Sequence, residues 1–400
     1  MPRRLAQPEF VALLAMLTAT VALSIDAMLP GIPMIAADLT PQDVNRAQLV
    51  LTAFVLGLGL GTLINGPLSD RFGRKPVIIG GLTIYAAAAV LAAAAPTLET
   101  LLAARVIQGL GAAAPRVVAM ALIRDLYKGR EMARISSFIM MIFILVPAVA
   151  PALGSLIMLG FGWRGIFGSF VVFAAISGLW LLVRQEETLP KSERRALSVA
   201  ALIAGTKETF SHRSVQIYTL VLMLGFGQMF GLLSSIQQIY GEVFDKADSF
   251  PMWFAAQAMI SGVGTLMNAK FVVRLGMRRI ALSAYLGQIV ISSVVLLLVG
   301  SGLLPAALMF PVFFVWSVSV FFMAGVTFGN IIALSLERLG HVAGIASSLV
   351  QGVSTIGAVL IAAPIGLAFN GTIIPLTVGT LACSAAAYAL LRRTIDTNED

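Results

Sequence analysis

The stretch Gly66-Pro67-Leu68-Ser69-Asp70-Arg71-Phe72-Gly73-Arg74-Lys75 lies between two long apolar runs, residues 48–64 and 76–95. It contains three cations and one acid, and each ionised group would be costly to place in hydrocarbon. The stretch is therefore predicted to be a hairpin at a membrane face, joining two membrane-spanning helices. Gly66 lets two helices approach closely, and Gly73 permits the positive φ of a tight turn.

Composition extends this prediction to the whole chain. Of the 400 residues, 58% are hydrophobic and 12% are charged, whereas a soluble domain carries about 25% charged residues. No interval is free of apolar runs, so we expect an all-α integral membrane protein without a sizeable soluble domain. The first run resembles a signal peptide, but it is long and contains Asp26, Pro30 and Pro33. We therefore expect it to be an uncleaved first span.

Twelve segments are long and apolar enough to cross a bilayer. They are residues 10–37, 47–68, 76–95, 98–122, 135–160, 165–184, 216–239, 251–273, 280–301, 304–334, 341–369 and 372–391. The polar stretch 185–215 divides them into two six-helix bundles, 1–184 and 216–400, and is predicted to be a cytoplasmic linker. A displacement of 203 residues aligns the first hairpin with a second one: Asn65, Arg71, Gly73 and Lys75 align with Asn268, Arg274, Gly276 and Arg278. Two parallel six-span repeats are typical of transporters.

The positions of the cations predict the orientation in the membrane. If both termini lie inside, 21 of the 27 Lys and Arg residues fall in inner segments and only Arg46, Arg164 and Lys246 in outer ones. This bias follows the positive-inside rule, so both termini are predicted to be cytoplasmic. The cations are not spread as a nucleic-acid-binding face would require. The single cysteine, Cys383, excludes an internal disulfide, and we expect no metal site or cofactor.

Asp26 is the only acid that lies clearly within a predicted span. Acids within the membrane are rare and are usually functional, and proton relays are one of their common uses. We therefore predict that Asp26 couples transport to protons. The alternative is a structural acid neutralised by a neighbouring helix. Pro30 and Pro33 follow it and are predicted to weaken the helix nearby.

A polar stripe runs along the predicted span 98–122. Arg105, Gln108, Ala112 and Arg116 fall on one helix face, and Arg116 lies about 16 Å beyond Arg105 along the axis. Such a stripe must face protein or a water-filled cavity. Arg116 either lines the cavity or anchors the helix at its cytoplasmic end. Other candidates for the substrate cavity lie in spans 135–160 and 216–239: Met140, Phe143, Gln228 and Met229.

The first hairpin resembles that between spans 2 and 3 of the major facilitator superfamily. The matching residues are Gly66, Leu68, Asp70, Arg71, Gly73, Arg74 and Lys75. Arg105 and Gln108-Gly109 are similar to the superfamily's fourth-span signature, which implies a role for Arg105 in proton transfer. The resemblance also implies that Asp70, Arg74 and Asp125 form a charge cluster that latches the inner gate.

Five stretches resemble the bicyclomycin and chloramphenicol resistance branch, a group of drug:proton antiporters. They are Asp26 with Leu29–Pro33, Ile123–Tyr127, Ser137–Met140, Gly162–Phe167 and Glu187–Pro190. The segment with Pro147, Pro151 and Gly154 is similar to the fifth-span antiporter signature. That resemblance implies that these residues shape the helix. A kinked packing helix is the alternative.

Together these features predict proton-coupled efflux of small amphipathic compounds across the bacterial inner membrane. The twelve spans would form the two pseudo-symmetric bundles of the major facilitator fold, and we expect a monomer. One alternative is a proton symporter that imports a nutrient. A membrane sensor is disfavoured because no long regulatory domain is present, and an enzyme because the spans contain a single acid and no nucleophile cluster.

Overall fold

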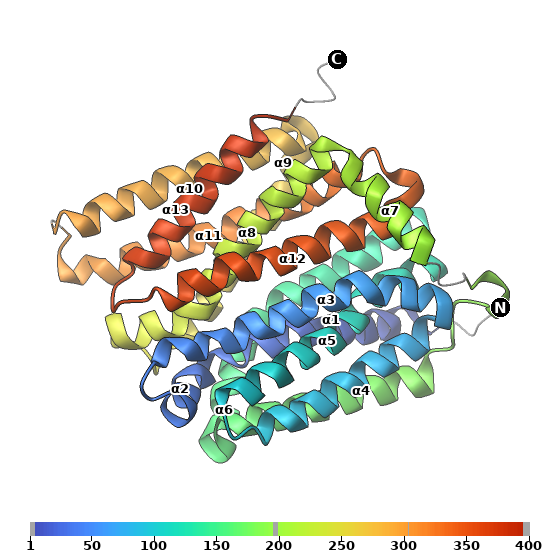
Figure 1. Ribbon diagram of the computed structural model, residues 1–400, viewed down its shortest axis with the longest axis horizontal. Helices are drawn as coiled ribbons and strands as arrows, with labels where there is room; N and C mark the ends of the chain where they lie inside the picture. Colours follow the sequence, from blue (N-terminus) through green and yellow to red (C-terminus); the bar gives the residue numbers. More distant parts are fainter. Residues whose placement is uncertain (1–4, 195–198, 303, 395–400) are drawn as a thin grey trace. The chain divides into compact units, whose positions relative to one another are not determined.

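The computed structural model describes residues 5–194, 199–302 and 304–394 of the chain. Within these ranges the chain forms helices joined by short turns, and no described residue lies in a β-strand. The chain divides into two compact units, Met1–Ile203 and Ala204–Asp400. Each unit is a bundle of long helices (Figure 1).

Unit 1 begins with a helix that is interrupted at its buried acid. The first helix α1 (Gln7–Asp26) ends at Asp26, and the short helices η1 (Leu29–Gly31) and α2 (Ile32–Leu39) continue the span. Pro30 falls in η1 and Pro33 in the first turn of α2. The remaining elements of the unit are η2 (Val44–Gln48), α3 (Leu49–Phe72), α4 (Arg74–Ala93), α5 (Leu98–Leu126), α6 (Gly129–Arg184) and η3 (Lys191–Glu193).

Helix α6 contains two of the predicted spans, because the chain reverses within it. Gly162 has non-helical angles, φ 61° and ψ −171°. Gly154 packs against Ala27, whereas the later Arg184 binds Glu9 at the opposite end of α1. The residues before and after Gly162 therefore run antiparallel along α1, which agrees with separate spans at 135–160 and 165–184.

Unit 2 contains the second set of helices. They are α7 (Val199–Ser211), which begins at the boundary between the units, α8 (Arg213–Gln238), the π-helical turn η4 (Ile239–Val243), α9 (Phe250–Leu275), α10 (Met277–Gly300), α11 (Ala306–Leu336), η5 (Gly340–Val342), α12 (Ala343–Leu367) and α13 (Ile374–Leu391). Helix α7 lies within the predicted linker, and its Glu208 carboxylate contacts His341 Nε2 in η5 at 2.5 Å.

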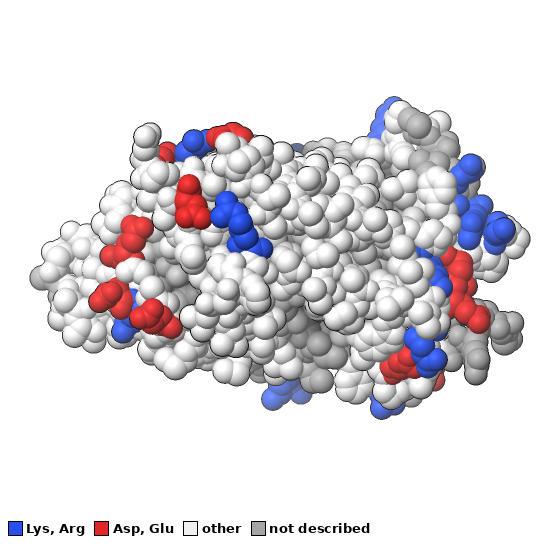
Figure 2. All heavy atoms as spheres, turned by 90° about the horizontal axis from the view of Figure 1, so that it is seen from below, with Lys and Arg blue, Asp and Glu red and all other residues white. Residues whose placement is uncertain are grey.

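Ten helical stretches of the described chain are long and apolar enough to cross a membrane. One of them, Leu145–Arg184, covers the reversal in α6 and so includes the later part of the predicted span 135–160 and all of the span 165–184. Helix α9 is not among the ten, and it carries the polar residues Gln257, Asn268 and Lys270. Its bounds nevertheless agree with the predicted span 251–273, and all twelve predicted spans correspond to helices. On the face shown in Figure 2, most charged side chains fall in separate groups, with a largely uncharged surface between them.

Close helix packing in unit 1 depends on glycine. A Cβ atom at Gly57 of α3 would lie 1.9 Å from the Val106 carbonyl oxygen of α5. A Cβ atom at Gly109 of α5 would lie 2.0 Å from the Phe54 carbonyl oxygen of α3. The two backbones therefore touch directly, as small residues allow between membrane helices. This contact brings the polar stripe of α5 against α3.

Candidate functional site

Arg105 is fully buried in unit 1, and backbone oxygens of two other helices hold it. Its Nε donates to the Val50 carbonyl of α3 at 3.1 Å, and one terminal nitrogen donates to the Ser24 carbonyl of α1 at 3.0 Å. The other terminal nitrogen donates to Gln108 Oε1 at 2.7 Å, one turn along α5. None of the described carboxylates pairs with it. The planar guanidinium fork thus joins α1, α3 and α5.

An aromatic ring covers the same guanidinium group. The Arg105 Cζ atom lies 4.4 Å from the centre of the Phe54 ring of α3 and 5.8 Å from that of Phe167 in α6. A cation over an aromatic face is attracted by the ring's quadrupole, and the attraction is larger where water is excluded. Hydrogen bonds and rings together compensate the buried charge without neutralising it.

Asp26 lies on α1 two residues after Ser24, whose carbonyl oxygen binds Arg105. It is 4% exposed, and it forms no hydrogen bond or ion pair with any described residue. Helix α1 ends at Asp26, and α6 passes close to the break, because a Cβ atom at Gly154 would lie 2.1 Å from the Ala27 carbonyl oxygen. The structure thus brings Gly154, predicted to shape a helix, directly beside the predicted coupling acid.

A short hydrogen-bond chain connects this part of α1 to α4. Ser24 Oγ donates to the Thr20 carbonyl at 2.6 Å and lies 2.6 Å from the Tyr85 hydroxyl. A serine has one hydroxyl proton, so the Tyr85 hydroxyl donates to Ser24. Neither Ser24 nor Tyr85 was predicted from the sequence. The signal for Ser24 was its position two residues before Asp26, whereas nothing in the sequence marked Tyr85.

The rest of the α5 stripe differs in burial from one turn to the next. Gln108 and Ala112 are fully buried, and the Gln108 amide nitrogen has no hydrogen-bond partner among the described residues. Arg116 is half-buried and forms no hydrogen bond or ion pair with the described part of the chain. The structure therefore separates a bound arginine, Arg105, from an unpaired one, Arg116, on the same helix face.

The hairpin between α3 and α4 forms a charge cluster around Arg74. Its guanidinium group donates to Asp70 at 2.5 Å, to Asp125 at the end of α5 at 3.0 Å and to Ser69 Oγ at 2.8 Å. The Arg74 side chain is largely buried, whereas the Asp70 side chain is 45% exposed and that of Asp125 20%, so the two ion pairs are only partly shielded from solvent. Arg71 is exposed and takes no part in the cluster, so Asp70 selects Arg74 of its two possible partners.

Glu187, from the segment after α6, caps the first turn of α4. Its carboxylate accepts hydrogen bonds from the backbone N–H groups of Arg74 and Lys75, both at 3.0 Å. These groups have no partner within the helix and carry partial positive charge, so an anion stabilises them. Gly73, with φ 103°, leaves space for this carboxylate, because a Cβ atom there would lie 2.5 Å from Glu187. Glu187 belongs to a stretch that resembles the antiporter branch, but this capping role was not predicted from the sequence.

Lys75 ties the same helix to the end of α6. Its Nζ donates to the Leu182 carbonyl at 2.7 Å. The Thr188 hydroxyl donates to Asp125 at 2.8 Å and so joins the segment after α6 to the end of α5. Four parts of unit 1 meet at this cluster: the end of α3, the start of α4, the end of α5 and the segment after α6. Gly66 lies about one turn before Asp70 in α3, and its carbonyl oxygen accepts a hydrogen bond from the Ser69 hydroxyl.

Comparison with protein families shows where the chain belongs. The model described as Major Facilitator Superfamily matches residues 14–391. The chain belongs to this superfamily. The match covers both units, and it accounts for the all-helical fold and the hairpin predicted from the sequence.

Three superfamily relatives illustrate the range of similarity. The chain is 30% identical over 346 residues to an uncharacterised MFS-type transporter, YdgK, of Bacillus subtilis, covering 84% of this chain and 83% of the relative. It is 28% identical over 359 residues to a bicyclomycin resistance protein homologue of Haemophilus influenzae, with coverage of 88% and 87%. It is 36% identical over 166 residues to the multidrug resistance protein MdtL of Escherichia coli, with coverage of 42% of each chain.

Solved structures of the superfamily share the fold. A D-xylose-proton symporter matches with a TM-score of 0.73 at 14% identity, covering 97% of this chain and 98% of the symporter. The human organic anion transporter MFSD10 matches with a TM-score of 0.63 at 19% identity, with coverage of 97% and 100%. The prediction of the major facilitator fold is thereby confirmed, and the protein is a membrane transporter of small molecules and not an enzyme.

The second hairpin of this superfamily member repeats the first only in part. Gly276 has φ 80°, close to the conformation of Gly73. Arg278 donates to the Leu391 carbonyl at the end of α13 at 3.3 Å, as Lys75 does to the end of α6. The alignment at 203 residues thus pairs residues with the same backbone role. Around Gly276, however, a Cβ atom would meet nothing within 4 Å.

The predicted cavity residues have different surroundings. Gln228 is fully buried in unit 2, where it accepts from Ser384 of α13 at 2.9 Å, so its amide oxygen is used inside the unit. Met229 is half-buried. The side chains of Met140 and Phe143 lie outside the described residues. Pro147 and Pro151 lie inside the first half of α6.

Proposed function

We propose that the protein exports small amphipathic compounds in exchange for protons. The observation that carries this proposal is the isolation of Asp26, a carboxyl group buried at a helix break without a partner among the described residues. A buried charge without a partner is costly, and a proton removes that charge. The names of two relatives, a bicyclomycin resistance homologue and a multidrug resistance protein, support drugs as the substrate class.

In this mechanism Asp26 takes up a proton from outside, and the substrate leaves as the proton binds. The protein then changes conformation so that the site opens to the cytoplasm, and the proton is released there. One proton that moves down about 100 mV supplies about 2.3 kcal/mol, enough for roughly a 40-fold gradient of a neutral solute. A single acid suits one proton per cycle.

Arg105 positions the break at which Asp26 lies. It holds the Ser24 carbonyl of α1, two residues before the acid, and the Val50 carbonyl of α3. A movement of α1 that changes the surroundings of Asp26 must therefore act on Arg105. We propose that these hydrogen bonds of Arg105 transmit the movement caused by protonation of Asp26 to α3 and α5.

The cluster around Arg74 is proposed to hold the cytoplasmic end of unit 1 in one conformation. It joins α3, α4, α5 and the segment after α6 through charged groups that can separate and re-form. The excess of cations in the inner segments supports cytoplasmic termini and an inner-membrane location. We further propose that the transporter acts as a monomer.

Proton movement in everted membrane vesicles tests the exchange. Candidate drugs are added to energised vesicles that contain wild type or Asp26→Asn, and the pH change inside the vesicles is followed by fluorescence. Asp43→Asn is the matched control, because Asp43 is exposed in the turn before η2 and its side chain binds none of the described residues. We expect wild type and Asp43→Asn to release protons on drug addition and Asp26→Asn to fail.

Three results would contradict the proposal. Equal responses from wild type and Asp26→Asn would make Asp26 structural. Proton movement in the same direction as the compound would indicate a symporter. A compound that accumulates without any proton movement would remove the coupling altogether.

A further inference from the structure

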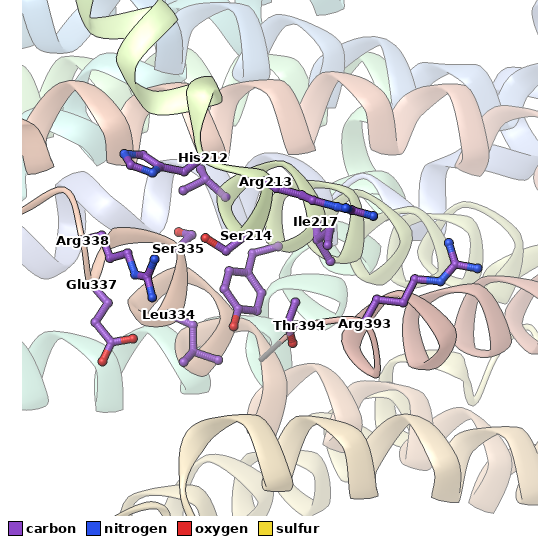
Figure 3. Close-up of a pocket in the computed structure, with 12 residues that line it drawn as sticks. His212, Arg213, Ser214, Ile217, Leu334, Ser335, Glu337, Arg338, Arg393 and Thr394 are labelled. Carbon is purple, nitrogen blue, oxygen red and sulfur yellow. The ribbon is translucent and has the colours of Figure 1, made fainter. Parts of the chain in front are cut away.

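A pocket of about 240 Å³ opens at one end of unit 2, where α8 begins and where α11 and α13 end. Three arginines line it: Arg213 on α8, Arg338 after α11 and Arg393 after α13. In Figure 3 the side chains of Arg213 and Arg393 extend along one side of the pocket, and Arg338 lies on the opposite side. Segments far apart in the sequence therefore place their cations around one cavity.

The guanidinium groups of these three exposed arginines form no hydrogen bond or ion pair within the described part of the chain. Glu337 also lines the pocket, so the lining side chains carry an excess of two positive charges with His212 neutral. The hairpin cluster of unit 1 differs, because Arg74 there has Asp70 and Asp125 as partners. Like charges held around one cavity repel each other unless an anion lies between them.

The backbone adds further donors to the same wall. Ser214 and Val215 belong to the first turn of α8, a helix of 26 residues, and both line the pocket. No side chain caps this turn. Its N–H groups have no partner in the helix and carry the positive end of the helix dipole, which favours an anion. Ser335 and Thr394 also line the pocket, but their hydroxyl groups already donate to the Ile332 and Leu391 carbonyls, so they are not donors for a ligand.

We propose that this pocket binds a phosphate group. Guanidinium groups bind phosphate through paired, charge-assisted hydrogen bonds, and helix N-termini bind phosphate through backbone N–H groups. A volume of about 240 Å³ is below the range of about 300–1,000 Å³ for drug-sized ligands, so it suits a head group and not a whole drug molecule. The phosphate belongs either to an anionic membrane lipid or to a small soluble phosphate compound, and both sources share this chemistry.

The test uses the purified full-length transporter and two probes. The first probe is phosphatidylglycerol in nanodiscs, with phosphatidylcholine nanodiscs for comparison, and retained lipid is counted by native mass spectrometry. The second is inorganic phosphate in detergent, measured by calorimetry against chloride at equal ionic strength. The variant is the double substitution Arg213→Gln/Arg393→Gln. Arg392→Gln is the matched control, because Arg392 is exposed at the end of α13 and does not line the pocket.

We expect the double variant to weaken binding at least roughly ten-fold, since it removes two of the three cations that would form charge-assisted hydrogen bonds to the phosphate. Arg392→Gln should change it less than about two-fold, because Arg392 does not line the pocket. Retention of phosphatidylglycerol without binding of free phosphate would identify a lipid head group, and binding of free phosphate would identify a soluble compound.

The proposal would be overturned if wild type bound neither probe. It would also be overturned if the double variant bound both probes with the same affinity as Arg392→Gln. Arg338→Gln alone, which removes one pocket cation, gives an independent check if the double variant does not fold. We expect it to weaken binding by several-fold, and an unchanged affinity in this variant would also count against the pocket.

Discussion

Replacing Arg105 by lysine removes the planar guanidinium group but keeps the positive charge. Arg105 makes three hydrogen bonds, of 3.1, 2.7 and 3.0 Å, to Val50, Gln108 and Ser24 on three helices. The guanidinium group of arginine is planar and holds its N–H donors in fixed directions. The ammonium group of lysine is a compact point charge at the end of a flexible chain. We expect a lysine to reach one of the acceptors and to lose the other two bonds.

The cost follows from those two bonds. A hydrogen bond to a charged group contributes about 1.5–3 kcal/mol, so their loss destabilises unit 1 by about 3–6 kcal/mol. Arg105 is fully buried, so solvent screens this loss little. For a folded unit of about this size, the loss should lower Tm by roughly 5 °C or more. Transport should fall as well, because the joint between α1 and α3 is loosened.

Thermal unfolding of the purified protein in detergent measures the first effect, and drug-driven proton movement in vesicles measures the second. Arg116→Lys is the matched control, because it makes the same change on the same helix face where no hydrogen bond is present in the described structure. Its Tm should stay within about 1 °C of wild type. A Tm for Arg105→Lys that equals that of Arg116→Lys would refute the argument.

Three further predictions concern close contacts in unit 1. Gly154→Ala places a methyl group 2.1 Å from the carbonyl of the α1 break and should cost about 1–3 kcal/mol by overpacking; Gly168→Ala, where nothing lies within 4 Å, should leave Tm nearly unchanged. Gly73→Ala should destabilise the protein more than Gly276→Ala, because both have positive φ but only Gly73 faces Glu187; equal losses of Tm would contradict this. Glu187→Gln should expose the start of α4 to amide hydrogen exchange at least about five-fold faster, since it removes the charge that caps two N–H groups; unchanged exchange would show that the cap contributes nothing.

The spans and the first hairpin were predictable because their signals are local. Charged residues cannot lie in hydrocarbon, so the positions of Asp70, Arg74 and Lys75 marked a membrane face before any contact was known. The positive φ of Gly73 followed from the need for a tight turn. The burial of Asp26 followed from its place within an apolar run.

The contacts that complete the site were not predictable, because the sequence does not mark their partners. Arg105 binds the carbonyl oxygens of Val50 and Ser24, and every residue type presents such an oxygen. Glu187 meets the start of α4 across 112 residues, and it is one of several acids in a polar segment. The choice of Asp70 between Arg71 and Arg74 depended on the helix turn that buries one arginine and exposes the other.

The backbone attachment of Arg105 also affects what mutational scans will find. A side-chain contact can be removed from either side, but a contact to a main-chain oxygen can be removed only by changing the arginine. Scans of α1 and α3 will therefore not find residues 24 and 50 as its partners, whatever their side chains do. The same property leaves α1 and α3 free to change many of their side chains while the contacts that Arg105 makes between the helices stay intact.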